Sequence, residues 1–265
     1  MAGTNKHVVF DVVGTSEHEP LNPLGTIAKP HSHLTGTCIS YDNFFEAVEE
    51  RMGERFRAQG IGTRIFGYCW MEAGEREYTY LSIAGAYRPF FDVFRSIFYR
   101  TLWQAGIQEP RKFATDEDRE FLLQSYRELK ARPDLVECWD KLRKAGFKVW
   151  CLTAGDIPRV AGYLKNGGVE MPEENFVSCD TIGIGKPEPR AYKFLLDKFD
   201  PSGLDAWFAA AHMWDAAAAK QVGFRGAWCS VWEKEQCSDI FGDMDVTSPD
   251  LPALADGIIA AAPKQ

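Results

Sequence analysis

The chain has 265 residues, a formal net charge of −8 and 45% hydrophobic residues, values that suit one large globular domain or a core with a smaller insert. Nucleic-acid binding is disfavoured, because the sequence has no dense run of lysine and arginine that could displace counterions. No stretch approaches the ~18 apolar residues of a membrane span, and the N-terminus lacks the apolar segment of a signal peptide. Seven cysteines without a C-x-x-C pair indicate reduced thiols. The sequence therefore predicts a cytoplasmic protein with no membrane partner.

The first predicted element is a buried strand over residues 7–11 that ends on Asp11. Residues 16–40 follow without periodicity and are rich in His, Pro, Gly and Thr, which is typical of a long functional loop. Its histidines (His18, His31 and His33) match no standard metal-ligand spacing, so we expect a solvated loop there and not a metal site.

A helical pattern covers residues 41–130. Apolar side chains recur about every 3.6 residues in the segments 41–56 and 88–106, as in amphipathic helices. A third helix is predicted over residues 115–129, where Thr115 is followed three residues later by Asp118, a helix N-cap signal.

Beyond residue 132 the pattern changes to alternating helices and strands. The predicted strands cover residues 147–153, 175–180, 206–212 and 226–231. Such alternation indicates βαβ units and a parallel sheet. The expected fold is therefore α/β, a doubly wound, Rossmann-like parallel sheet with a helical cap domain inserted after the first strand. The predicted core comprises residues 1–15 and 132–265, and the predicted cap comprises residues 16–131.

In doubly wound folds the ligand crevice lies outside the carboxyl ends of the strands. Asp11, Thr153 and His212 each end a predicted strand, Asp215 follows His212 closely, and Lys186 lies in the loop before a predicted helix. Each of these residues alone has an ordinary structural explanation, such as a helix cap, a solvated charge or a core histidine. Their order and spacing predict that they converge on one site.

With these residues in place, the sequence resembles the haloacid dehalogenase (HAD) superfamily over nearly its whole length. Asp11 with Gly14-Thr15 resembles the nucleophile motif, and Thr153, Lys186 and Asp215 resemble the second, third and fourth motifs. The segments "GKPEPRAY" and "HMWDAAAAKQVGFRGAW" are most similar to type II (L-)2-haloacid dehalogenases. The resemblance implies that Asp11 attacks the substrate and forms an aspartyl ester.

A valine at position 13 has a chemical meaning in this comparison. The phosphatases of the superfamily carry there a second acid that protonates the leaving alkoxide. Val13 cannot donate a proton, and a halide needs none to leave. The resemblance thus implies a hydrolase of carbon–halogen bonds that needs no cofactor. We expect Lys186 to favour the ionised form of Asp11, and His212 or Asp215 to position or deprotonate the hydrolytic water.

Three positions depart from the dehalogenase pattern: Met71 stands where the cap arginine is expected, Ala154 follows the second-motif hydroxyl, and His212 replaces an asparagine. Arg76 or Arg64 could replace the missing cap cation. The departures keep open an epoxide hydrolase of the same superfamily, whose His-x-Trp-Asp segment is similar, and a non-catalytic binding protein. A Mg²⁺-dependent phosphatase or phosphonatase is a further alternative, with Asp11, the Val13 carbonyl and Asp215 as ligands.

The expected partner is a small anionic organic substrate, and the aromatic stretch over residues 90–103 is a candidate face for a homodimer. Substrate contacts are expected from the first loop, the cap and the later motifs, at Val12, Val13, Trp70, Met71, Arg76, Ala154, Tyr192 and Trp214.

Overall fold

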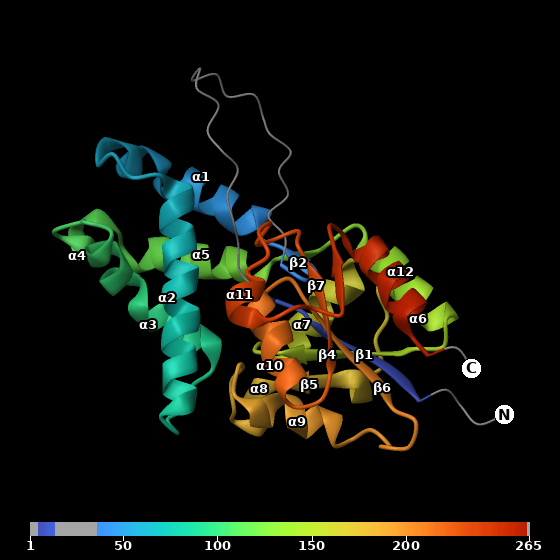
Figure 1. The fold of residues 1–265 in the computed structure, drawn as a ribbon. Helices are drawn as coiled ribbons and strands as arrows, with labels where there is room; N and C mark the ends of the chain where they lie inside the picture. The colour runs from blue at the N-terminus through green and yellow to red at the C-terminus, as the bar shows by residue number, and fades with distance from the viewer. Residues whose placement is uncertain (1–4, 14–35, 264–265) are drawn as a thin grey trace.

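A six-stranded parallel sheet forms the centre of the protein. The computed structural model describes residues 5–13 and 36–263 (Figure 1). The strand order is β5-β4-β1-β6-β7-β8, and all neighbouring pairs are parallel. The predicted α/β class is confirmed. The strands are β1 (Lys6–Asp11), β4 (Lys148–Thr153), β5 (Phe176–Ser178), β6 (Asp205–Ala210), β7 (Arg225–Cys229) and β8 (Val246–Ser248).

Strand β1 occupies a central position in this sheet. Val8, Val9 and Phe10 are fully buried, because a parallel strand covered on both faces needs a continuous apolar run. Strand β1 pairs with β4 along one edge and with β6 along its other edge. The strand order therefore changes direction at β1, and this switch point places Asp11 at the mouth of the crevice.

Helices cover both faces of the sheet (Figure 1). Apolar residues of α6, α7 and α12 pack in one core with Val8 and Phe10, whereas those of α9 and α10 pack in another with Val9. The helices of this part are α6 (Leu135–Lys144), α7 (Ile157–Asn166), α8 (Cys179–Ile182), α9 (Pro189–Leu196), α10 (Met213–Gln221), α11 (Ser238–Phe241) and α12 (Leu251–Ala261), with a 3₁₀ turn, η1 (Glu173–Asn175).

A separate group of helices stands beside the sheet (Figure 1). Its centre is aromatic: Trp70 stacks on Phe94 with ring centroids 4.0 Å apart. A short antiparallel pair, β2 (Ile39–Ser40) with β3 (Lys130–Ala131), joins the two ends of this group. The assignment of residues 16–131 to a cap domain stays a prediction. The helices are α1 (Asp42–Ala58), α2 (Thr63–Ile83), α3 (Phe90–Gln104), α4 (Pro110–Phe113) and α5 (Asp116–Arg127).

Local predictions in this helical part have different outcomes. The N-cap prediction is confirmed, since Thr115 and Asp118 form a reciprocal capping box at the start of α5. The predicted dimer face corresponds to α3, in which Phe94 and Phe98 are buried inside the cap and Trp103 is exposed; the homodimer stays a prediction. Gly14, Thr15 and residues 16–35 of the predicted loop, with His18, His31 and His33, lie outside the described residues, whereas Ile39–Ser40 at the end of the predicted loop form β2.

The described residues also bear on the other bulk predictions. None of their helices combines the length and the apolar character that crossing a lipid bilayer requires. All seven cysteines are free thiols, and only Cys69 and Cys237 among them are exposed.

Candidate active site

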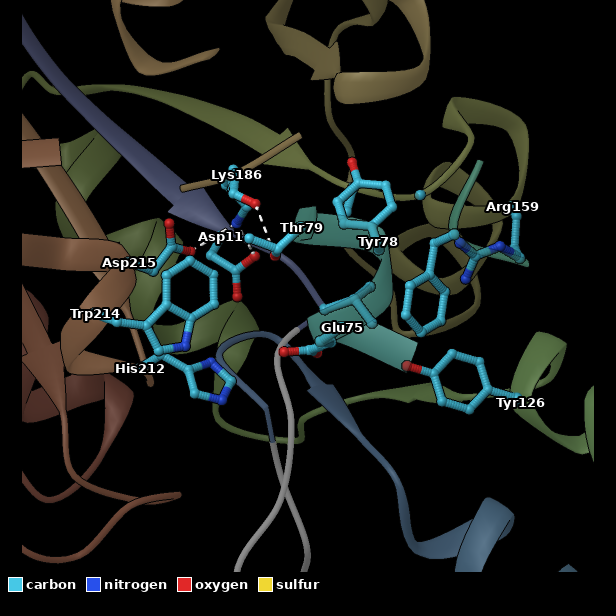
Figure 2. A pocket seen from close by; sticks show the side chains of 14 residues that line it. Asp11, Glu75, Tyr78, Thr79, Tyr126, Arg159, Lys186, His212, Trp214 and Asp215 are labelled. Carbon is cyan, nitrogen blue, oxygen red and sulfur yellow. Dashed lines mark hydrogen bonds and ion pairs between the residues drawn. The ribbon is translucent and has the colours of Figure 1, made fainter. Parts of the chain in front are cut away.

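A buried ion-pair network forms at the carboxyl end of the sheet (Figure 2). Nζ of Lys186 lies 2.6 Å from Oδ1 of Asp11 and 2.6 Å from Oδ2 of Asp215. All three side chains are at most 5% exposed. Asp11 comes from the end of β1, Asp215 from the first turn of α10, and Lys186 from the loop before α9. The structure thus brings together the three charged residues that the sequence predicted to converge.

The charges of this network depend on one another. Burial alone would lower the pKa of Lys186, but Asp11 and Asp215 raise it above its ordinary value, so the side chain stays an ammonium group. Burial raises the pKa of Asp215, an effect that Lys186 opposes and Asp11 reinforces. Tyr192 also donates a hydrogen bond to Oδ1 of Asp215, which favours the ionised form.

Thr37 is a member of the site that the sequence analysis did not single out. Its hydroxyl donates to Oδ2 of Asp11 over 2.9 Å and accepts the backbone N–H of Ala211 over 2.8 Å. Both oxygens of Asp11 are therefore held, one by Lys186 and the other by Thr37. The only sequence signal was the threonine-rich composition of the long loop, which does not distinguish one threonine from another.

A small cavity of ~50 Å³ opens in front of Asp11, between the sheet and the helices beside it (Figure 2). Seven lining residues were predicted from the sequence: Asp11, Val13, Ala154, Lys186, His212, Trp214 and Asp215. Seven were not: Glu75, Tyr78, Thr79 and Phe90 from α2 and α3, Tyr126 from α5, and Gly155 and Arg159 from the region of α7.

His212 and Trp214 form the wall of the cavity next to Asp215 (Figure 2). His212 is the N-cap residue of α10 and is buried. Its ring centroid lies 5.5 Å from that of Trp214 and 5.7 Å from that of Trp232. Trp214 in turn lies 6.0 Å from Nζ of Lys186. The aromatic neighbours fix the imidazole at the edge of the cavity.

Trp70, Met71 and Arg76, which were predicted to contact the substrate, do not line the cavity. Trp70 and Met71 are fully buried within the group of helices α1–α5, where Nε1 of Trp70 donates to the Phe94 carbonyl. Arg76 is exposed and pairs with Glu77. Trp70 lies on a different face of α2 from Glu75, whereas Met71 lies on the same face one turn earlier, where it is buried. The α2 residues that line the cavity are Glu75, Tyr78 and Thr79.

Three core residues also lie elsewhere than predicted. Tyr192 is buried behind Asp215 and bonds to it, so it does not line the cavity. Val12 is fully buried and its carbonyl accepts the N–H of Cys38. Thr153 ends β4 as predicted, yet its hydroxyl accepts the N–H of Gly155 and shapes the loop. These residues support the cavity wall from behind.

The donor set does not fit a magnesium ion bound by Asp11, the Val13 carbonyl and Asp215. Among the described residues, no group of three or more His, Cys, Asp or Glu side chains could hold a metal ion. The ammonium group of Lys186 lies between the two carboxylates. Their remaining oxygens accept hydrogen bonds from Thr37 and Tyr192. An ammonium group thus has the position that a dication between these carboxylates would need.

Comparison with known proteins places this site in a family. A family model described as haloacid dehalogenase-like hydrolase matches residues 25–223. The chain belongs to this family. The recognised superfamily is thereby confirmed, and with it the expectation of hydrolytic chemistry.

Individual members of the haloacid dehalogenase-like family are also similar to this chain. It is 28% identical to (S)-2-haloacid dehalogenase 1 of Pseudomonas sp. (strain CBS-3), over 82% of this chain and 80% of that protein. It is 24% identical to the (S)-2-haloacid dehalogenase of Pseudomonas fluorescens, over 74% and 81%. An L-2-haloacid dehalogenase of Xanthobacter autotrophicus, solved with chloropropionic acid covalently bound, has the same fold, with a TM-score of 0.61, 19% identity, and 95% and 97% of the two chains covered.

Proposed function

We propose that this protein is a 2-haloacid dehalogenase that uses Asp11 as its nucleophile and needs no cofactor. The supporting observation is a buried carboxylate, held by Lys186 at 2.6 Å, that faces a cavity lined by charged and aromatic side chains. Val13 lines the same cavity where a phosphatase would carry its proton donor. The chain's similarity to two (S)-2-haloacid dehalogenases supports the same conclusion.

The reaction follows from the positions of these groups. A carboxylate oxygen of Asp11 attacks the carbon that carries the halogen, and the halide leaves with the electron pair of the broken bond. The product is an ester between Asp11 and the substrate. Lys186 and Thr37 orient the carboxylate for this displacement. A halide leaves without a proton, so this reaction needs no proton donor at position 13.

Hydrolysis of the ester completes the cycle. Water attacks the carboxyl carbon of Asp11, and the bond from this carbon to the ester oxygen breaks. The leaving alkoxide takes up a proton, which releases a 2-hydroxy acid and restores the carboxylate. His212 lines the cavity beside Asp215 and accepts the proton of the attacking water. The oxygen in the product hydroxyl therefore originates from Asp11, and the water oxygen remains in Asp11.

A single turnover in ¹⁸O-labelled water tests this proposal. Excess enzyme reacts with 2-chloropropionate, chloride release is measured, and the peptide that contains Asp11 is analysed by mass spectrometry. We expect one ¹⁸O atom in Asp11 and unchanged activity in the presence of EDTA. Chloride release with the label only in the product would exclude the aspartyl ester. No chloride release from any 2-haloacid would exclude the dehalogenase assignment.

One observation favours the epoxide hydrolase as a second candidate. Glu75 lines the cavity from the cap side and, in its acid form, would donate a proton to the alkoxide that epoxide opening creates. The ester step would be the same, with label again in Asp11. Turnover of an epoxide-bearing carboxylic acid, lost in Glu75→Gln but with chloride release from 2-chloropropionate retained, would support this second activity.

A further inference from the structure

Arg159 is a cation of the cavity that the proposed displacement does not use. It comes from α7 and lines the cavity together with Gly155. Its side chain is 10% exposed. In Figure 2 it lies on the opposite side of the cavity from Asp215 and His212, beyond Tyr78. A buried guanidinium group facing a cavity is a strong anchor for a carboxylate.

The neighbours of Arg159 orient its guanidinium group and leave one of its nitrogen atoms available to donate a hydrogen bond to a ligand. Nε donates to Oδ2 of Asp156 over 2.9 Å, and Nη1 donates to the hydroxyl of Tyr163 over 2.9 Å. The guanidinium carbon lies 4.7 Å from the ring centre of Phe91. Among the described residues, Nη2 has no hydrogen-bond partner. The group is thus rigidly placed and retains a donor for a ligand.

Gly155 makes this placement feasible. A Cβ atom at position 155 would lie 2.1 Å from Nη2 of Arg159, closer than any real contact. The loop after Thr153 therefore carries no side chain where the guanidinium group crosses it, and both residues form the same part of the cavity wall.

Both cations of the cavity are paired, but Arg159 pairs only with the half-exposed carboxylate of Asp156, whereas Lys186 pairs with two buried carboxylates. Lys186 contacts both Asp11 and Asp215. The carboxylate of a 2-haloacid is bonded to the reacting carbon and so must lie next to Asp11, whereas Arg159 lies across the cavity (Figure 2). The rings of Tyr78, Phe90 and Tyr126 also line the cavity, and they suit a methylene chain.

We propose that Arg159 binds a second, remote carboxylate, so that the preferred substrate is a 2-halo dicarboxylic acid. This inference rests on the proposed dehalogenase function. Glu75 lines the cavity on the side of Asp11 and His212 in Figure 2. Its negative charge disfavours a second anion there and so directs that group towards Arg159.

Kinetics on a chain-length series test this proposal. Chloride release is measured with 2-chloropropionate and with 2-chloro dicarboxylic acids of increasing length, for the native protein and for Arg159→Met, Arg159→Lys and Arg127→Met. Arg127 is a matched control, because its guanidinium carbon also lies over Phe91, at 4.5 Å, yet it does not line the cavity.

We expect the native protein to prefer a dicarboxylic acid of one length over 2-chloropropionate. Arg159→Met should raise KM for that acid by about 10- to 100-fold, the value of a hydrogen-bonded charge pair, with little change for 2-chloropropionate. Arg159→Lys should restore part of the loss. An equal effect of Arg159→Met on both substrate types, or the same pattern in Arg127→Met, would overturn the proposal.

A binding measurement separates this inference from the function on which it rests. Asp11→Asn protein is titrated calorimetrically with unhalogenated dicarboxylic acids of increasing length and with propionate, with and without Arg159→Met. Tighter binding of a diacid that disappears with Arg159→Met supports the subsite even if no 2-haloacid is turned over. Equal or absent binding of the diacids overturns it.

Discussion

The two sides of the cavity are built on different principles. On the core side, which comprises Asp11, Thr37, Lys186 and Asp215, every carboxylate oxygen has a hydrogen-bond partner and every side chain is buried. On the cap side, which comprises Glu75, Tyr78, Thr79, Phe90 and Tyr126, the surface is mainly aromatic. A rigid charged side fixes where the reaction takes place, and a largely apolar side determines which molecule reaches it.

Among the described residues, a few polar contacts join the helices that carry the cap side to the rest of the protein. The hydroxyl of Tyr163 donates to the carbonyl of Tyr126 over 2.9 Å. The hydroxyl of Tyr87 donates to Asp180 over 2.7 Å, and the hydroxyl of Ser82 accepts the N–H of Gly185 over 2.8 Å. The hydroxyl of Thr79 reaches the carbonyl of Lys186 over 3.4 Å. Substitutions on the core side should therefore change kcat and stability, whereas substitutions on the cap side should change mainly KM.

Asp11→Asn should have the largest effect and is the strongest test of the core side. The amide is not a nucleophile, so we expect a loss of activity of about 10⁴-fold or more. Chloride release measures this loss, and circular dichroism verifies that the variant is folded. Activity within tenfold of the native protein would show that the chemistry does not depend on this carboxylate. It would contradict the conclusion that the core side carries out the reaction.

Lys186→Met should be the most damaging single change to stability. It leaves two buried carboxylates without their shared cation, a loss of about 3–5 kcal/mol in the free energy of unfolding. Denaturant titration at pH 7 measures it. Lys193→Met is the matched control, because Lys193 forms an exposed pair with Asp197 and should cost at most about 1 kcal/mol. Equal losses in the two variants would contradict the role of burial.

The pH dependence of that difference has a defined sign. The native pKa of Lys186 is raised, so its stabilising contribution is complete below the unfolded value of about 10.4 and is lost as pH rises beyond it. The stability advantage of the native protein over Lys186→Met should thus shrink above about pH 10. This stability difference should also shrink in acid, where Asp11 and Asp215 of the variant, which have lost their cation, take up a proton.

Tyr192→Phe should produce an intermediate effect. It removes the hydrogen bond to Asp215, leaves that buried oxygen unsatisfied and costs about 1–3 kcal/mol at neutral pH. The bond favours the carboxylate form and its loss raises the pKa of Asp215, so the destabilisation should be larger at pH 8 than at pH 5. Unfolding at both pH values measures it. Tyr99→Phe, which removes a surface bond to Asp116, should show no comparable dependence between pH 5 and pH 8.

Tyr87→Phe should have the smallest effect and tests the junction between the two sides. The variant loses the hydrogen bonds of Tyr87 to Asp180 and to the Tyr78 hydroxyl, both only partly buried, so we expect a change of about 1 kcal/mol in stability. KM should rise a few-fold with kcat unchanged, because the cap side is held less firmly against the core. Tyr80→Phe, at a position of α2 that is 60% exposed, is the control. A fall in kcat without a change in KM would contradict the division of roles.

Sequence patterns predicted the elements whose signals are local. The buried run of β1, the α/β alternation after residue 132 and the capping box at Thr115 were all readable, because periodicity and capping depend on neighbouring residues. The short strand β8 and helix α12 were not assigned. Three residues of β8 carry too little periodicity to be distinguished from a loop.

For the site, the sequence by itself determined the convergence of Asp11, Lys186 and Asp215. Asp11 ends β1 and Asp215 follows the neighbouring strand β6, so both lie at the carboxyl edge of the sheet. Lys186 lies in a loop on that edge, and its place in the order of the motifs is what indicated that it joins them. Only the tertiary structure decided which residues face them. Trp70 and Glu75 lie on the same helix, and packing of its aromatic face against α3 turned Trp70 inward and Glu75 towards the cavity. Arg159 had no distinguishing signal, because the direction of a helical side chain is set by the contacts of its helix with the rest of the protein.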